Sequence, residues 1–197
     1  MRSRCRTLVV IAIAAVSLAR NQQKIFTIRK LDSNVGFAVT KWMVVKEEGR
    51  FKDFEGTIHF DQKKPAAIQV EFTVYTNSVD SRNSDRDNAI RSRDMLHVAK
   101  FPTMMFHSVK ATALSETELS VEGDCTIKAT TKRITVPVKL LGVQYTGDYD
   151  GTVAGFETTF VIDRNDFGAT GWPALIGKDV TIHMLIGASD KPNSASN

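Results

Sequence analysis

The sequence predicts an all-β protein: an antiparallel barrel of about eight strands, with one short helix covering an end. Nine segments alternate apolar and polar side chains with the period of two that is typical of half-buried strands. Strands with one apolar and one polar face favour an antiparallel sheet that meets water on one side. A single segment, residues 79–108, interrupts this alternation near the middle of the chain.

The alternating segments run through most of the chain and are separated by turns and polar loops. Residues 68–75 show the cleanest pattern, with Ile68, Val70, Phe72 and Val74 on one face. The expected strands span residues 25–31, 35–40, 54–61, 68–75, 103–112, 118–128, 133–141, 152–163 and 179–188.

The connections between these strands carry expectations of their own. Residues 42–45 form an apolar stretch without a clear period, and Gly49 is expected to break the chain after it. Residues 142–151 are expected to form a long polar hairpin loop whose ends pair with each other. Residues 164–178 form a second long loop.

The central interruption predicts the short helix. Residues 81–87 are polar and turn-rich, residues 87–96 have helical spacing, and Pro102 ends the irregular piece. We expect helix to be confined mostly to residues 85–99, where it would cover one mouth of the barrel.

A closed barrel suits so many consecutive strands because closure leaves no unpaired sheet edge. Eight strands make a barrel just wide enough to hold one ligand. A sandwich of two sheets fits the alternation almost as well, so the pattern leaves both architectures open.

The first 19 residues have the layout of a secretory signal peptide. Arg2, Arg4 and Arg6 precede a short apolar run, and Ser17 and Ala19 provide the small residues of a cleavage site. The run is short for a bilayer span, although a retained membrane anchor is the alternative. The expected organisation is therefore a signal peptide (1–19), one β-barrel domain (20–190) and a disordered tail (191–197), in a periplasmic or secreted protein.

Removal of this leader changes the charge balance. Three of the 26 basic residues and none of the 22 acidic residues lie in 1–19, so the net charge falls from +4 to +1. No basic stripe with interleaved aromatic residues remains, which argues against a nucleic-acid partner.

Residues for catalysis or metal binding do not form a recognisable constellation. The four histidines are scattered, and although His59 and Asp61 share a strand face, no third metal ligand follows at a suitable spacing. Nucleophile-elbow, zinc-protease, paired-cysteine and phosphate-loop motifs do not occur. Cys125 shares its parity with Val121 and Ile127, which indicates an inward-facing apolar residue. We expect no catalytic residues, no metal and no cofactor.

The inward parity of the strands defines a candidate apolar pocket. Its residues are bulky enough to fill a small barrel by themselves, so a solid core is the alternative to a ligand cavity. The candidate lining comprises Phe37, Val39, Phe54, Ile58, Phe60, Val70, Phe72, Val74, Met104, Phe106, Val121, Val138, Phe156, Phe160, Ile182 and Met184.

An ordered set of segments resembles the YceI-like family of secreted bacterial proteins that bind polyisoprenoid lipids. The segments are FTIRKLDSNVGFAVTKW, GRFKDFEGTIHFD, RDNAIRSRDMLHVAKFPTMMF, VEGDCTIKATTKRITVPV and GFETTFVIDRNDFG, in this order, and the resemblance extends over roughly residues 25–188. The resemblance implies a lipocalin-like barrel whose apolar interior holds an isoprenoid chain such as a polyprenol or a quinone.

The late motif of the resemblance raises the question of a headgroup site. Asp163, Arg164 and Trp172 could lie near a lipid headgroup, or Asp163 and Arg164 could form a structural ion pair beside a tight turn at Gly168. The expected partner is an isoprenoid lipid, with transient membrane contact, and the protein is expected to be a monomer or a homodimer. A lipid-modifying enzyme and a solid-barrel interaction protein are the alternatives.

The leader generates the first prediction. The signal peptide should be removed between Ala19 and Arg20, because small residues at Ser17 and Ala19 suit signal peptidase. N-terminal sequencing of the protein from its native cells measures this directly. Membrane-bound protein that still begins with Met1 would contradict the prediction.

Overall fold

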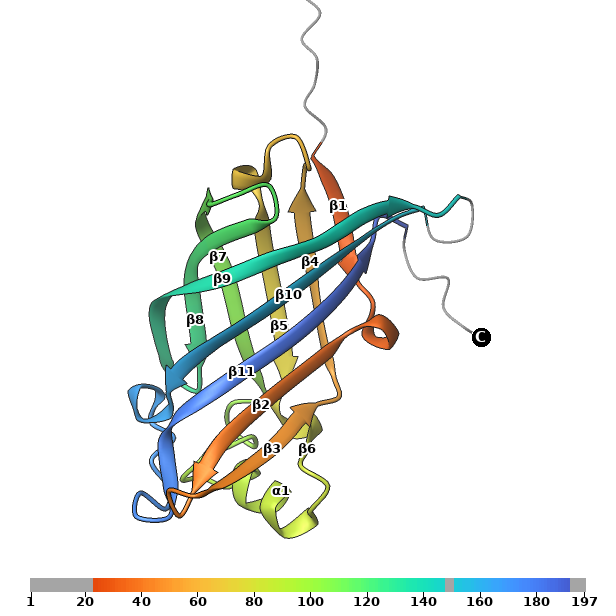
Figure 1. Cartoon of the computed structure of the whole chain (residues 1–197). Helices are drawn as coiled ribbons and strands as arrows, with labels where there is room; N and C mark the ends of the chain where they lie inside the picture. Colours follow the sequence, from red (N-terminus) through yellow and green to blue (C-terminus); the bar gives the residue numbers. More distant parts are fainter. Residues whose placement is uncertain (1–22, 148–150, 192–197) are drawn as a thin grey trace, which may run out of the picture.

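Eight strands close into an antiparallel barrel, as Figure 1 shows. The computed structural model describes residues 23–147 and 151–191. The ring consists of β1 (Lys24–Ile28), β4 (Phe54–Phe60), β5 (Gln69–Tyr75), β7 (Thr103–Ala113), β8 (Glu118–Ile127), β9 (Thr130–Tyr145), β10 (Thr152–Asp163) and β11 (Ile176–Ser189), in that order. The predicted all-β class and the barrel are confirmed, and the alternative of a two-sheet sandwich is wrong.

The seam of the ring lies between β1 and β11. Thr27 pairs with Ser189 and Ile28 pairs with Ala188. Beside this short pairing, the ammonium group of Lys24 donates to Asp190 at 2.7 Å and to the hydroxyl of Thr152 at 2.6 Å. These contacts join the first strand of the barrel to the last two.

Three strands extend the sheet beyond the ring. The rest of β11 pairs with β2 (Asn34–Lys41), which pairs with β3 (Val45–Phe51), which in turn pairs with the short β6 (Val79–Asp80). The 3-10 turns of the described chain are η1 (Lys30–Asp32), η2 (Pro65–Ala67), η3 (Thr76–Ser78) and η4 (Arg164–Phe167). The β2–β3 hairpin therefore projects past the seam at one end of the barrel (Figure 1).

The expectation that Gly49 breaks the chain was wrong. Gly49 lies inside β3, directly opposite Phe37. A Cβ atom at this position would lie only 2.5 Å from the ring of Phe37. The glycine therefore lets an aromatic ring cover the strand closely, and it does not act as a turn residue.

The helix is real but shorter than predicted. α1 spans Ser84–Arg91, and Asn83 caps it by accepting a hydrogen bond from the amide of Arg86 at 2.9 Å. The helix ends at Ser92, whose backbone is extended, and residues 92–99 continue as turns. The side chain of Arg91 donates to the carbonyl of Val79 at 2.9 Å. Helical spacing up to residue 96 was misleading because Leu96 packs against the barrel core from a turn.

The hairpin expected at residues 142–151 is shorter than predicted. β9 continues to Tyr145, which pairs with Thr152 at the start of β10. The ends of the loop are paired, as expected. Residues 148–150 lie outside the described part, as do residues 1–19 and 192–197, on which the predictions of a signal peptide and a tail depend.

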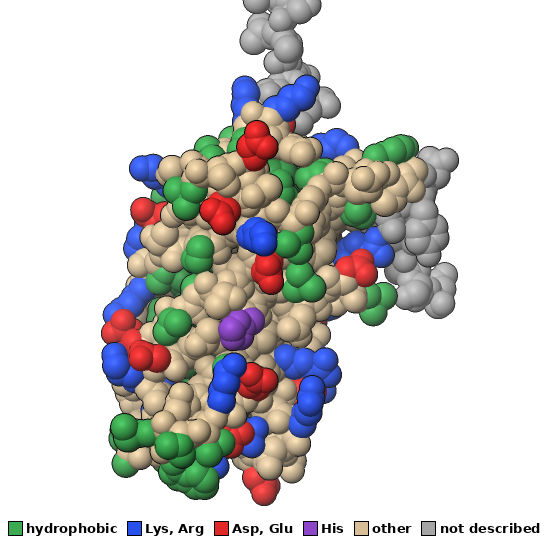
Figure 2. Space-filling model, in the orientation of Figure 1, with side chains coloured by type: hydrophobic (Ala, Val, Ile, Leu, Met, Phe, Trp, Pro, Cys, Tyr) green, Lys and Arg blue, Asp and Glu red, His purple; other side chains and the backbone are tan. Residues whose placement is uncertain are grey.

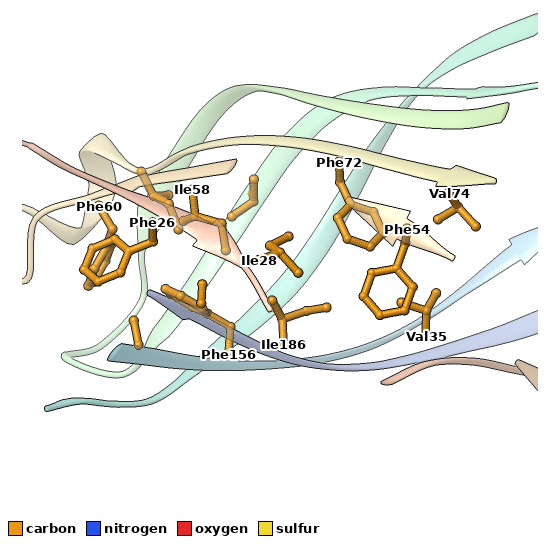
Figure 3. Close-up of a cluster of buried hydrophobic side chains, with 14 of the residues drawn as sticks. Phe26, Ile28, Val35, Phe54, Ile58, Phe60, Phe72, Val74, Phe156 and Ile186 are labelled. Atoms are coloured by element: carbon orange, nitrogen blue, oxygen red, sulfur yellow. The ribbon is translucent and has the colours of Figure 1, made fainter. Parts of the chain in front are cut away.

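The packed core fills one end of the barrel. Phe60 meets Phe156 edge-on, with ring centroids 5.5 Å apart, and Phe26 lies beside them (Figure 3). A second aromatic pair, Phe54 and Phe72, lies further along the barrel with centroids 5.9 Å apart. Phe60 is the last residue of β4, and this end of β4 lies opposite α1 (Figure 1).

The packed end generates the second prediction. Phe26→Ala should lower the free energy of unfolding by about 3–5 kcal/mol, because the ring is only 1% exposed and its removal leaves a void. Leu31→Ala is the matched control, since Leu31 is 94% exposed and should change stability by under about 0.5 kcal/mol. Chemical denaturation of both variants measures the difference, and equal losses would show that this end is not a packed core.

Candidate functional site

The barrel contains an apolar cavity of about 540 Å³. This volume lies within the range of about 300–1,000 Å³ that is typical of ligand sites. Ile58 and Phe156 lie at its inner end, whereas Arg86 and Trp172 lie at its outer end. Because Trp172 is exposed, the cavity reaches the molecular surface near α1 and the loop before β11.

All but two of the sixteen candidate pocket residues line this cavity. The two exceptions are Phe54 and Phe60, which point inward but pack against Phe72 and Phe156. Strand parity predicts correctly that both side chains face inward. It does not predict their position along the barrel axis. The residues that do line the cavity are Phe37, Val39, Ile58, Val70, Phe72, Val74, Met104, Phe106, Val121, Val138, Phe156, Phe160, Ile182 and Met184.

The cavity also has lining residues that the candidate set missed. Some of them, including Val35, Ile162 and Val180, face inward on strands that were already predicted. Extending the alternation by one or two residues along each strand would have identified them. Others come from the central segment, where Ile90 and Leu96 face the barrel interior. No period in the sequence links those two to the strands, so only the tertiary structure brings them to the site.

The outer end of the cavity is polar on one side. Arg86 of α1 forms an ion pair with Glu47 of β3 at 2.6 Å, and their side chains are 32% and 19% exposed, respectively. Lys41 lies 3.7 Å from the same carboxylate. α1 is therefore tied electrostatically to the β2–β3 hairpin, and it covers part of the opening as a short plug.

Arg164 holds the loop that borders the opening. Its Nε donates to the carbonyl of Gly177 at 2.9 Å, and its Nη2 donates to the carbonyl of Ile176 at 2.9 Å. Its Nη1 donates to the carbonyl of Ala169. Burial lowers the pKa of this guanidinium, which nevertheless stays charged at neutral pH. The hydrogen-bonding capacity of Arg164 is thus used by backbone carbonyls, although its side chain lines the cavity.

The other two candidate headgroup residues differ in position. Asp163 does not line the cavity: it caps η4 by accepting from the amide of Asn165 at 2.9 Å and pairs with Lys178 at 3.1 Å. The hydrogen bond from Lys178 is the main reason that the pKa of Asp163 is lowered. Trp172 lines the outer end. The sequence-based ion pair between Asp163 and Arg164 is replaced by these separate contacts, whereas Gly168 has the predicted positive φ of 72°.

Cys125 lies among the apolar residues of the cavity wall. Burial raises the pKa of its thiol to about 11, because a thiolate is poorly solvated in apolar surroundings. At neutral pH the side chain is therefore an uncharged thiol and a poor nucleophile.

Titratable side chains do not converge inside the barrel. Among residues 23–147 and 151–191, no three histidine, cysteine or acidic side chains lie close enough to hold a metal ion. In the same part of the chain, the helices are too short or too polar to cross a membrane. The chemistry of the site is that of an apolar container with a few polar groups at its opening.

Known proteins resemble this chain in sequence and in fold. Protein YceI of Salmonella arizonae is 42% identical over 122 residues, which cover 62% of this chain and 63% of that protein. The match thus spans less than two thirds of the length of the Salmonella protein. A Campylobacter jejuni YceI protein has the same fold with a TM-score of 0.68 and 27% identity, over 76% of this chain and 88% of that one.

Two more distant structures share the barrel. BcnA of Burkholderia cenocepacia superposes with a TM-score of 0.74 at 23% identity, covering 82% of this chain and 99% of that one. A polyisoprenoid binding domain from Saccharophagus degradans superposes with a TM-score of 0.60 at 13% identity, covering 83% and 97%. The sequence model of the YceI-like domain matches residues 26–188, and the chain belongs to the YceI-like family.

Proposed function

We propose that the protein binds and carries an isoprenoid lipid, such as a polyprenol or a quinone, whose apolar tail occupies the cavity. The observation that carries this proposal is a cavity of about 540 Å³ walled by aliphatic and aromatic side chains from most strands of the barrel. A solid-barrel interaction protein would have no reason to keep this volume empty, because unfilled space in a core costs stability.

The energy of binding would come from burial of the tail. Each buried CH₂ group contributes about 0.8 kcal/mol, so ten carbons give about 8 kcal/mol before the cost of immobilising the chain. An isoprenoid is a suitable ligand because its branched, apolar chain matches a wall without regularly placed polar groups. The Saccharophagus degradans domain is a polyisoprenoid binding domain built on the same fold, which agrees with this choice.

We propose binding without chemistry. The cavity wall presents Cys125 as an uncharged thiol, and Arg164 is already occupied by backbone carbonyls. Neither group is prepared to act as a nucleophile or a base on a bound lipid. A carrier in the periplasm or outside the cell would need only the container and a way for lipid to enter it.

Extraction of the purified protein tests the proposal directly. Mass spectrometry of an organic extract should find an isoprenoid at close to one molecule per barrel. The control is an extract of an unrelated protein from the same preparation. Absence of isoprenoid from protein expressed in its native cells would contradict the proposal, and turnover of the bound lipid would favour the enzyme instead.

A substitution in the cavity gives the next prediction. Ile182→Trp should reduce lipid retention while the fold survives at a cost of about 1–3 kcal/mol. Ile182 is half-buried, lines the cavity and lies between Phe37 and Phe160 across the sheet, so a larger side chain there enters the empty volume. Lipid content and thermal unfolding are measured on the same sample.

Val161→Trp is the matched control for this experiment. Val161 lies next to Phe160 on β10, but its side chain is 58% exposed and is not part of the cavity wall. It should retain the lipid content of the unchanged protein. Val74→Trp is a less suitable probe, because Val74 is almost fully buried in the packed core. Equal lipid content in both variants would show that the tail does not occupy the region around Ile182.

Cys125 provides a probe of cavity occupancy. With a thiol pKa of about 11, alkylation at about pH 8 should be slow, because only about one thiol in a thousand is ionised. Removing bound lipid should expose the thiol and speed up alkylation, which mass spectrometry follows over time. Raising the pH toward 11 should speed up both reactions, because the thiolate then becomes populated. An alkylation rate that does not depend on lipid would show that the ligand lies away from Cys125.

A further inference from the structure

Large apolar side chains gather at the open end of the barrel. We call this group the rim patch; it consists of Trp42, Met43 and Val44 at the tip of the β2–β3 hairpin, and Trp172 in the loop before β11. Their exposed fractions are 59%, 93%, 83% and 42%, respectively. Figure 2 shows apolar side chains gathered at the lower end of the molecule, where Figure 1 places the β2–β3 turn and the loop before β11.

The two parts of the rim patch are connected through the backbone. The amide of Trp42 donates to the carbonyl of Leu175 at 2.9 Å, and the amide of Leu175 donates to the carbonyl of Trp172 at 3.0 Å. Trp172 and Leu175 also line the cavity. The patch is therefore a continuation of the apolar interior onto the surface, and not an isolated group of exposed residues.

The hairpin tip keeps its bulky residues in an unfavourable backbone conformation. Trp42 and Met43 have φ values of 51° and 62°. Tight hairpin turns with positive φ at consecutive positions strongly prefer Asn-Gly, because a bulky side chain in this region is strained. A tryptophan and a methionine at these positions serve neither the turn nor the packed core. Strain of this kind is characteristic of a functional surface.

The dimensions and chemistry of the patch favour a lipid bilayer over a protein partner. A stable protein interface buries about 800 Å² of surface on each partner. Two adjoining loop tips offer roughly a few hundred Å² of apolar surface. Tryptophan is enriched where membranes meet water, and both tryptophans of this chain lie in the patch. A narrow apolar projection fits between lipid headgroups without a complementary surface.

From these observations we propose that the rim patch docks on the surface of a lipid bilayer and turns the cavity opening toward the membrane. The proposal rests on the lipid-carrier function in one respect, since it describes how a lipid would pass between membrane and cavity. The docking itself depends only on the exposed side chains and can be measured on lipid-free protein.

The charged groups beside the tip predict how the contact responds to salt. Lys46 pairs with Glu48 at 2.9 Å, and Lys41 lies 3.7 Å from Glu47. Lys178, next to the end of β2, has Asp163 and Asp179 as partners. Because each lysine already has a carboxylate partner, attraction to anionic headgroups is weak. Docking should persist on neutral vesicles and between about 0.1 M and 1 M salt.

Tryptophan fluorescence tests the proposal on the unaltered protein. Both tryptophans belong to the patch, so adding phosphatidylcholine vesicles to lipid-free protein should shift the tryptophan emission to the blue. Brominated phosphatidylcholine should quench it. Flotation of the protein with the vesicles gives the bound fraction.

A double substitution at the tip provides the matched variant. Trp42→Asn with Met43→Gly installs the residues that the turn prefers, so the thermal midpoint should be no lower than that of the unaltered protein. Vesicle affinity should fall about tenfold or more, because the two largest exposed side chains are lost. The control is Leu114→Ser, which removes a 65% exposed side chain from the β7–β8 turn at the opposite end of the barrel and should leave vesicle affinity unchanged.

The outcomes separate docking from lipid carriage. Loss of vesicle binding in the double variant alone supports docking. No blue shift and no flotation of the unaltered protein overturns docking, even if an isoprenoid is found in the extract. Vesicle binding without any extracted isoprenoid supports docking and contradicts the carrier. A protein that sediments as a dimer through the patch, with the double variant as a monomer, overturns the bilayer as the partner.

Discussion

The short pairing of β1 with β11 closes the barrel. It converts a twisted antiparallel sheet into a ring, and the ring surrounds an interior volume with paired strands on every side. The direct ladder is short, and the contacts of Lys24 with Asp190 and Thr152 reinforce it. β11 can be shared in this way because it is long: one end pairs with β1 and the rest pairs with β2.

The sharing of β11 also explains why the two ends of the barrel differ. At the end where β1 closes the ring, Phe26, Phe60 and Phe156 meet and fill the interior. At the other end, β2 and β3 extend the sheet beyond the ring, and the cavity reaches the surface beside α1 and the loop before β11. The barrel therefore has a packed base and an open top. The aromatic side chains that stabilise the fold and the opening of the cavity lie at opposite ends of the same barrel.

The open end combines charged side chains that hold its loops in place with apolar side chains that are exposed to solvent. Arg164 fixes the loop before β11 through backbone carbonyls, and the ion pair of Arg86 with Glu47 ties α1 to the β2–β3 hairpin. These polar contacts hold in place a rim whose outer side chains are apolar and exposed. A rim that is fixed by polar contacts and presents tryptophan and methionine to the outside is what the proposed docking on a bilayer requires.

The alternation of apolar and polar residues is enough to predict the all-β class, most of the strand segments and the inward parity of fourteen residues that line the cavity. This was possible because a period of two is a local property, set by the pleat of each strand. The strand that contains Gly49 was missed because a glycine facing an aromatic ring looks like a chain break until its neighbour Phe37 is known. The helix end at Ser92 was missed because Leu96 reaches the core from a turn.

Which inward residues pack together and which border empty space depends on how the strands are arranged in the closed barrel. Phe60 and Phe72 both face inward on neighbouring strands, yet Phe60 seals the base and Phe72 lines the cavity. The difference is their height along the barrel, which depends on strand stagger and on how the ring closes. The rim patch has the same origin: Trp42 and Trp172 are far apart in the sequence, and the hydrogen bond between Trp42 and Leu175 brings their loops together. The position of a residue along the barrel axis and the contacts between distant loops are set by the closed sheet. A local pattern in the sequence does not specify them.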